Sequence, residues 1–101
     1  MQTISVTELK TKLDNGESPI IIDVREPYEF EEFNISGRLI PLGSLQSALH
    51  DLEDFMEEEI IIHCHSGARS AAATDFLTKQ GFSNVKNLIG GMVAWKAMVG
   101  V

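Results

Sequence analysis

The chain has 101 residues, which suffices for one hydrophobic core, so we expect a single domain over residues 1–101. The formal net charge of −7 argues against a nucleic-acid partner, because a phosphate backbone is bound by a basic patch. No apolar run approaches the ~20 residues that span a bilayer, no secretory signal is visible, and a lone cysteine excludes an internal disulfide; we therefore predict a cytoplasmic protein that does not enter membranes.

The first quarter of the chain predicts a strand, a helix and a second strand. Ile4 is expected to end a short strand, and residues 5–8 match a capping box that would start a helix. Asn15-Gly16 would end this helix, since glycine favours the position just after a helix. The three isoleucines at 20–22 predict a central strand, which places Asp23 and Arg25 at its carboxyl end.

The next segment predicts a short helix, a short strand and a longer helix. Pro27 suits the first position of a helix, and Pro41 would stop a strand at 39–40. Ser44 or Ser47 is expected to cap an amphipathic helix. The apolar stripe of this helix would consist of Leu45, Leu49, Leu52, Phe55 and Met56.

Residues 60–70, with the sequence IIIHCHSGARS, are the most informative stretch. The apolar run predicts a strand covered on both faces, which delivers Cys64 to a tight loop at Gly67. Ser70 is predicted to cap the following helix. A helix N-terminus and a nearby arginine both lower a thiol pKa, so we expect a thiolate-rich Cys64, with Arg69 turned toward it.

The remainder predicts a helix that stops at Gly81, a strand at 85–89 and a final helix at 92–98. Strands thus alternate with helices, which indicates an α/β domain whose mostly parallel sheet has about five short strands flanked by helices on both faces. Ligands bind outside the carboxyl ends of such strands. Cys64, the 23–25 segment and the Gly90-Gly91 pair would all lie there.

An ordered set of motifs resembles the single-domain rhodanese (sulfurtransferase) family over almost the whole chain. The motifs are IIDVRE at 21–26, EF at 29–30, IPL at 40–42, IIHC at 61–64, GARS at 67–70, GF at 81–82, NLIGG at 87–91 and AW at 94–95. The resemblance implies a rhodanese-like fold and a catalytic Cys64 that carries a persulfide. It implies that backbone amides cradle this group, contributed by His65, Ser66, Gly67, Ala68, Arg69 and Ser70.

The resemblance further implies transfer of a sulfane sulfur from a donor such as thiosulfate to a thiophilic acceptor, which is cyanide, a thiol or a protein. No cofactor and no metal are expected, and the chain is expected to be a monomer or a weak dimer. Arg25 is a candidate for binding the donor anion at the mouth of the loop, while Arg69 either contacts the ligand or pairs with a carboxylate.

The sequence departs from the family pattern before the third strand. The family carries a His and a Pro where this chain has Asn34 and Ser36. The loop also has a single fixed cation, Arg69, whereas members specialised for thiosulfate tend to have a strongly basic loop. Thiosulfate is therefore expected to be a poor donor.

Two other functions remain open from the sequence. Related phosphatases and arsenate reductases use a cysteine loop with the spacing C-x5-R, but Cys64 and Arg69 are spaced C-x4-R, which favours a tighter cradle for a single sulfur atom. A non-catalytic interaction module of the same family is the third reading. The presence of Cys64 argues against it, since inactive members commonly lack the cysteine.

Overall fold

The computed structural model describes all 101 residues, in which strands and helices alternate. The elements are β1 (Gln2–Ile4), α1 (Val6–Asp14), β2 (Ile20–Asp23), α2 (Pro27–Glu32), β3 (Arg38–Leu39), η1 (Leu42–Ser44), α3 (Leu49–Leu52), η2 (Glu53–Phe55), β4 (Ile60–His63), α4 (Ala68–Lys79), β5 (Val85–Leu88) and α5 (Gly91–Val99), where η marks a 3-10 helix. None of the helices combines the length and the apolar character needed to cross a bilayer.

The strands form one sheet in the order β1-β5-β4-β2-β3, and every neighbouring pair is parallel. Strand β4 lies in the middle and pairs with β2 from Ile20↔Ile60 to Asp23↔His63. Because the strands are parallel, their carboxyl ends meet at one edge of the sheet. The predicted α/β fold with a parallel five-stranded sheet is confirmed.

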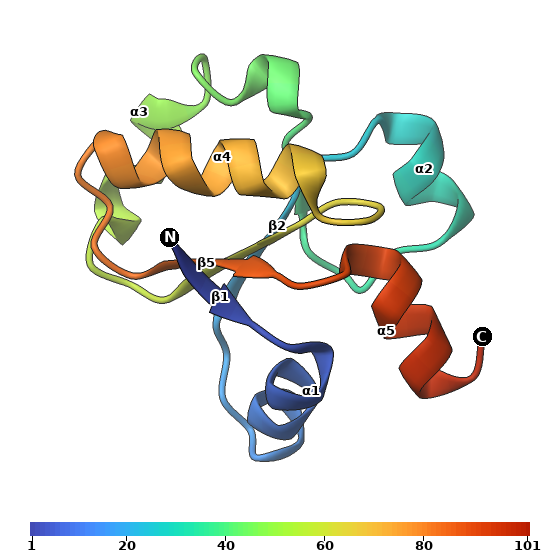
Figure 1. Cartoon of the computed structure of the whole chain (residues 1–101). Coiled ribbons are helices and arrows are strands. Elements are labelled where there is room, and N and C mark those ends of the chain that lie inside the picture. The colour runs from blue at the N-terminus through green and yellow to red at the C-terminus, as the bar shows by residue number, and fades with distance from the viewer.

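Helices cover both faces of the sheet. Helices α3 and α4 lie over one face, and α1 and α5 lie over the other (Figure 1). Side chains alternate between these faces along β4: Ile60 and Ile62 join the core under α4, and Ile61 joins the core under α1 and α5. A strand buried on both sides needs apolar residues at every position, which explains its unbroken apolar run.

The predicted helix ends near the N-terminus are confirmed. The Ser5 hydroxyl accepts a hydrogen bond from the Glu8 amide at 3.1 Å, and the Glu8 carboxylate accepts one from the Ser5 amide at 3.0 Å. Gly16 follows the helix with a φ of +81°, a conformation that favours glycine. Pro27 opens α2, as expected.

The single amphipathic helix predicted after Ser44 or Ser47 is wrong. The segment forms three short helical pieces, η1, α3 and η2, and the residue that precedes α3 is Ala48. Gly43 and two serines within a few residues give the segment a low helix propensity. Its apolar residues still reach the core, where Leu45 and Leu52 are fully buried, so burial is achieved without a continuous helix.

Candidate active site

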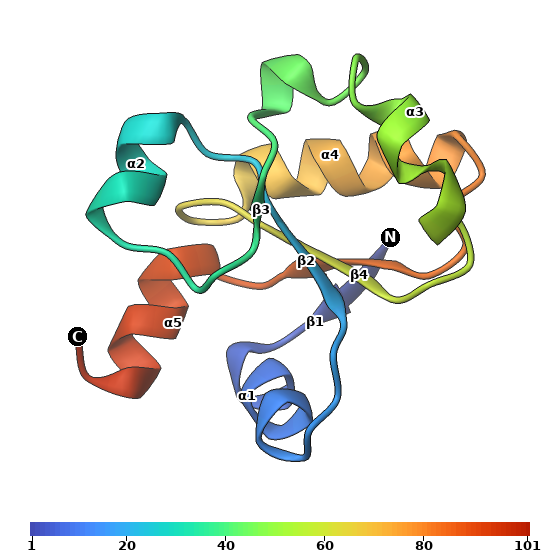
Figure 2. The same cartoon turned by 180° about the vertical axis from the view of Figure 1, so that it is seen from behind.

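Cys64 lies directly after β4, at the carboxyl edge of the sheet. It packs in the same core as Ile60 and Ile62, on the face covered by α4, and only 1% of its surface is exposed. The loop that follows lies between α2 and the start of α5 (Figures 1 and 2). His65, Ser66 and Ala68 on this loop are exposed.

Gly67 turns the chain back toward the sulfur. It precedes α4 with a φ of +116°, a region that side chains with a Cβ rarely adopt, so glycine is required there. The prediction that Ser70 caps the helix is wrong, because α4 already begins at Ala68. The sharp turn at Gly67 starts the helix three residues earlier than predicted and places the Ser70 side chain beside the sulfur.

Two backbone amides and one hydroxyl group surround the Cys64 sulfur. The amide of Gly67 donates to Sγ at 3.1 Å, the amide of Ser70 donates at 3.3 Å, and the Ser70 hydroxyl oxygen lies 3.3 Å away. Burial on its own raises the pKa of the Cys64 thiol. The hydrogen bonds from the Ser70 hydroxyl and from the amides of Ser70, Gly67 and Ser66 outweigh burial and hold the pKa below its ordinary value.

Asn87 is a site residue that the sequence reasoning missed. It lies on β5, is 8% exposed, and its side-chain oxygen accepts a hydrogen bond from the Ser70 hydroxyl at 2.5 Å. The available signal was a polar residue inside the strand predicted at 85–89. A buried polar side chain needs a partner, so it marks a place where another polar group approaches.

Arg69 pairs with a carboxylate, which was one of its two predicted roles. Its guanidinium donates to Glu29 of α2 through both ends, Nη1 to Oε1 at 2.7 Å and Nη2 to Oε2 at 3.0 Å. The hydrogen bond from Arg69 lowers the pKa of Glu29 to about 2. The pair ties the start of α4 to α2, and the groups that most lower the pKa of the thiol are the Ser70 hydroxyl and the backbone amides.

Replacing Glu29 with glutamine should remove this ion pair and cost about 1 kcal/mol at neutral pH, because the pair is bidentate but partly exposed. The folded-state pKa of Glu29 lies below its ordinary value of 4.5, so the stabilisation is fully present above pH 4.5 and is lost as the pH falls toward about 2. Urea unfolding of the protein and of Glu29→Gln at pH 7 and at about pH 3 measures this difference.

Glu32→Gln is the matched control, since Glu32 lies exposed on the same helix and makes no side-chain ion pair. Its unfolding free energy should follow that of the unmodified protein at both pH values. A penalty for Glu29→Gln that stays the same at both values would contradict the assigned pairing.

Arg25 is held away from the mouth of the loop. Its guanidinium is buried against the Asp23 carboxylate, with Nη2 donating at 2.8 Å and Nε at 2.9 Å, and Nη2 also donates to the Phe33 carbonyl at 2.7 Å. These contacts join the end of β2 to the chain that follows α2. The structure therefore gives Arg25 a structural contact and does not support its predicted role in binding a donor anion.

The backbone at Gly91 packs against the carbonyl groups of the loop. The Met92 amide donates to the Cys64 carbonyl at 2.9 Å, and the Val93 amide donates to the His65 carbonyl at 3.0 Å. A Cβ at Gly91 would lie 2.5 Å from the Cys64 carbonyl oxygen and 2.8 Å from that of His65. The backbone at Gly91 therefore packs directly against the backbone of the loop, at the edge of the sheet where the sequence places the Gly90-Gly91 pair.

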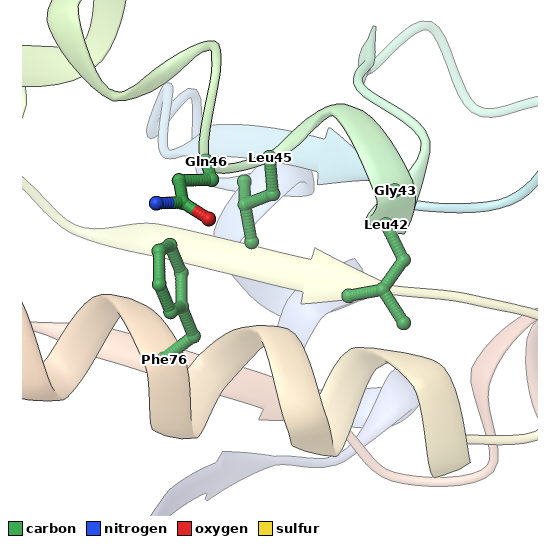
Figure 3. A pocket seen from close by; sticks show the side chains of 5 residues that line it. All are labelled: Leu42, Gly43, Leu45, Gln46 and Phe76. Atoms are coloured by element: carbon green, nitrogen blue, oxygen red, sulfur yellow. The ribbon is translucent and has the colours of Figure 1, made fainter.

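The surface has no large cavity at the sulfur. None of its four hollows is lined by Cys64 or by a residue of the loop. One of them, of about 250 Å³, lies between η1 and α4 and is lined by Leu42, Gly43, Leu45, Gln46 and Phe76 (Figure 3). The cradle around Cys64 therefore lies outside all four hollows.

The site is thus a buried cysteine that is held by backbone amides at the carboxyl edge of a parallel sheet. The sequence model of the rhodanese-like domain family matches residues 5–98, so the chain belongs to the rhodanese-like domain family.

Known relatives agree with this membership. "Putative sulfur carrier protein YrkF" of Bacillus subtilis is 43% identical over 93 residues, which cover 91% of this chain and 49% of YrkF. "Sulfurtransferase" of Allochromatium vinosum is 35% identical over 97 residues, 91% of this chain and 85% of that protein. The crystal structure of a rhodanese-like domain protein from Staphylococcus aureus has a TM-score of 0.79 at 33% identity and covers 94% of this chain and 91% of its own. The chain thus spans about half the length of YrkF.

Proposed function

We propose that the protein is a sulfurtransferase that carries a sulfane sulfur on Cys64. The observation that supports this most strongly is the cradle itself, in which the amides of Gly67 and Ser70 both point at Sγ. Fixed donors of this kind stabilise an anion that develops in front of them. A persulfide is such an anion, and it is small enough for a loop that opens into no large cavity.

The reaction would proceed in two displacements. The Cys64 thiolate attacks the outer sulfur of a donor such as thiosulfate, a new S–S bond forms, and sulfite leaves with the electron pair of the broken bond. A thiolate, cyanide or protein thiol then attacks the outer sulfur of the persulfide, and Cys64 leaves as a thiolate. This is covalent catalysis with one intermediate, and ping-pong kinetics follow from it.

The acceptor must be slender or carried on a flexible segment. Only 1% of Cys64 is exposed, so a nucleophile reaches the outer sulfur and not the cysteine itself. Arg69 is engaged by Glu29 and leaves the loop without a free cation for thiosulfate, so a persulfide donor should load the protein faster than thiosulfate does. A cytoplasmic setting fits a single cysteine that must stay reduced.

Intact-protein mass spectrometry tests the proposal. Brief exposure to thiosulfate, or to glutathione persulfide, should add the mass of one sulfur atom, and cyanide should remove it. The reversal by cyanide is needed because two oxygen atoms have nearly the mass of one sulfur, and the chain has 4 methionines that can be oxidised. No gain with either donor would overturn the proposal and favour a phosphatase-like or a purely binding role.

A further inference from the structure

A small buried polar cluster lies beside the sulfur, on the side away from solvent. It consists of the Ser70 hydroxyl, the Asn87 side chain and the Gly67 carbonyl, and Ser70 is fully buried. Unlike the backbone amides, whose hydrogens are fixed in direction, a hydroxyl hydrogen can rotate. The cluster therefore contains the one donor at Cys64 that can change its partner.

The Ser70 hydroxyl has one hydrogen and three acceptors within reach. The Asn87 side-chain oxygen lies 2.5 Å from Ser70 Oγ, the Gly67 carbonyl 3.2 Å and Cys64 Sγ 3.3 Å. The amide group of Asn87 is oriented by the Gly67 carbonyl, which lies 3.5 Å from Nδ2 and can only accept. Asn87 consequently presents its oxygen to Ser70, and the shortest of the three contacts draws the hydroxyl hydrogen to Asn87.

We propose that Asn87 is a positioning residue that holds the Ser70 hydroxyl hydrogen away from the sulfur while Cys64 is a thiol, and so limits how readily Cys64 becomes an anion. In the thiol state, the Cys64 hydrogen donates to Ser70 Oγ, and Ser70 donates to Asn87. When the thiol loses its proton to solvent, the hydroxyl hydrogen turns from Asn87 to the sulfur, and no covalent bond at Ser70 or Asn87 changes.

Ionisation of the Cys64 thiol therefore has an energetic cost that arises at Asn87 and not at the sulfur. Asn87 loses its hydrogen-bond donor when Ser70 turns, and a buried acceptor without a donor is unfavourable. A persulfide anion on Cys64 draws the Ser70 hydroxyl hydrogen away from Asn87 in the same way, and only this extension rests on the proposed function.

Charged groups around the loop leave this exchange as the adjustable interaction. The Arg69 charge favours the Cys64 thiolate, but its pairing with Glu29 holds it in place, and His65 is exposed to solvent. The other nearby groups point elsewhere: His63 lies toward Asp23, Arg25 pairs with Asp23, Lys86 pairs with Glu59, and Lys96 lies over the Phe33 ring.

The pH dependence of iodoacetamide alkylation of Cys64 tests the proposal. Asn87→Ala frees the hydroxyl for the sulfur, so the midpoint should fall by about half to one pH unit. Ser70→Ala removes the hydroxyl, and the midpoint should rise by about one unit. In the Ser70→Ala background, Asn87→Ala should leave the midpoint unchanged, because Asn87 then has no Ser70 hydroxyl to bind.

Two further variants keep the test decisive. Asn87→Leu keeps the branching and the number of side-chain heavy atoms and should lower the midpoint as Asn87→Ala does, which covers the case in which the truncated side chain destabilises the fold. Asn84→Ala removes an amide side chain just before β5 and should leave the midpoint unchanged. A midpoint that rises or stays in both Asn87 variants, or a shift that persists without the Ser70 hydroxyl, would overturn the proposal. Alkylation needs no sulfur donor, so a failure of sulfur loading would be distinguishable from either result.

Discussion

Replacing Cys64 with serine is expected to abolish sulfur loading and all turnover of donor. A serine hydroxyl in the same place cannot form a persulfide, and it is a weak nucleophile without an adjacent base. Intact mass after treatment with thiosulfate or glutathione persulfide, together with release of sulfite, measures the loss. A cyanide-sensitive gain of mass in Cys64→Ser would show that sulfur is carried elsewhere.

The fold should tolerate this substitution, which makes the variant interpretable. Serine is slightly smaller than cysteine and can accept the same hydrogen bonds from the amides of Gly67 and Ser70. We expect the free energy of unfolding to fall by only about 1 kcal/mol. A urea unfolding curve recorded beside the sulfur assay separates loss of chemistry from loss of structure.

Replacing Gly91 with alanine should destabilise the protein by about 3 kcal/mol and greatly slow sulfur loading. Gly91 has a φ of +52°, which costs alanine about 1–2 kcal/mol. The new Cβ would also meet the carbonyl oxygens of Cys64 and His65, both part of the backbone. The loop must shift to relieve these contacts, and the hydrogen bonds from Met92 and Val93 weaken as it does.

Gly100→Ala is the matched control for this prediction. Gly100 also has a positive φ, +81°, but a Cβ there would meet nothing within 4 Å. It should therefore show only the conformational cost, about 1 kcal/mol, with normal sulfur loading. Equal losses of unfolding free energy for the two substitutions would contradict the expected clash between the new Cβ at position 91 and the loop carbonyls.

The fold follows from local patterns in the sequence. The capping box at Ser5, the proline at the start of α2 and the isoleucine runs of β2 and β4 each act within a few residues, and each is confirmed. The helix expected after Ser44 or Ser47 failed for a different reason. Its apolar side chains do face the core, and their burial does not require one continuous helix. The poor helix formers in this segment allow three short helical pieces instead.

The position of Cys64 at the carboxyl edge of the sheet was predictable from the sequence, and the contacts around it were not. Glu29 and Arg69 are 40 residues apart, so no local pattern indicates their pairing. Ser70 suits either the cap or the first turn of a helix, and the choice depends on the φ of Gly67, which the residue type permits but does not impose. The contact with Asn87 depends on the sheet order, which places β5 beside β4.

The cradle around Cys64 combines backbone amides with the Ser70 hydroxyl, and none of its contacts to the sulfur comes from the exposed side chains of the loop. The side chains of His65, Ser66 and Ala68 are exposed and make no hydrogen bond to the sulfur, while the amides of the same loop do not depend on which side chains they carry. Such a loop can change its outer face over evolution, and with it the molecules it receives, without rebuilding its chemistry. For the sulfur transfer proposed above, the same freedom makes these positions the place to alter donor or acceptor preference.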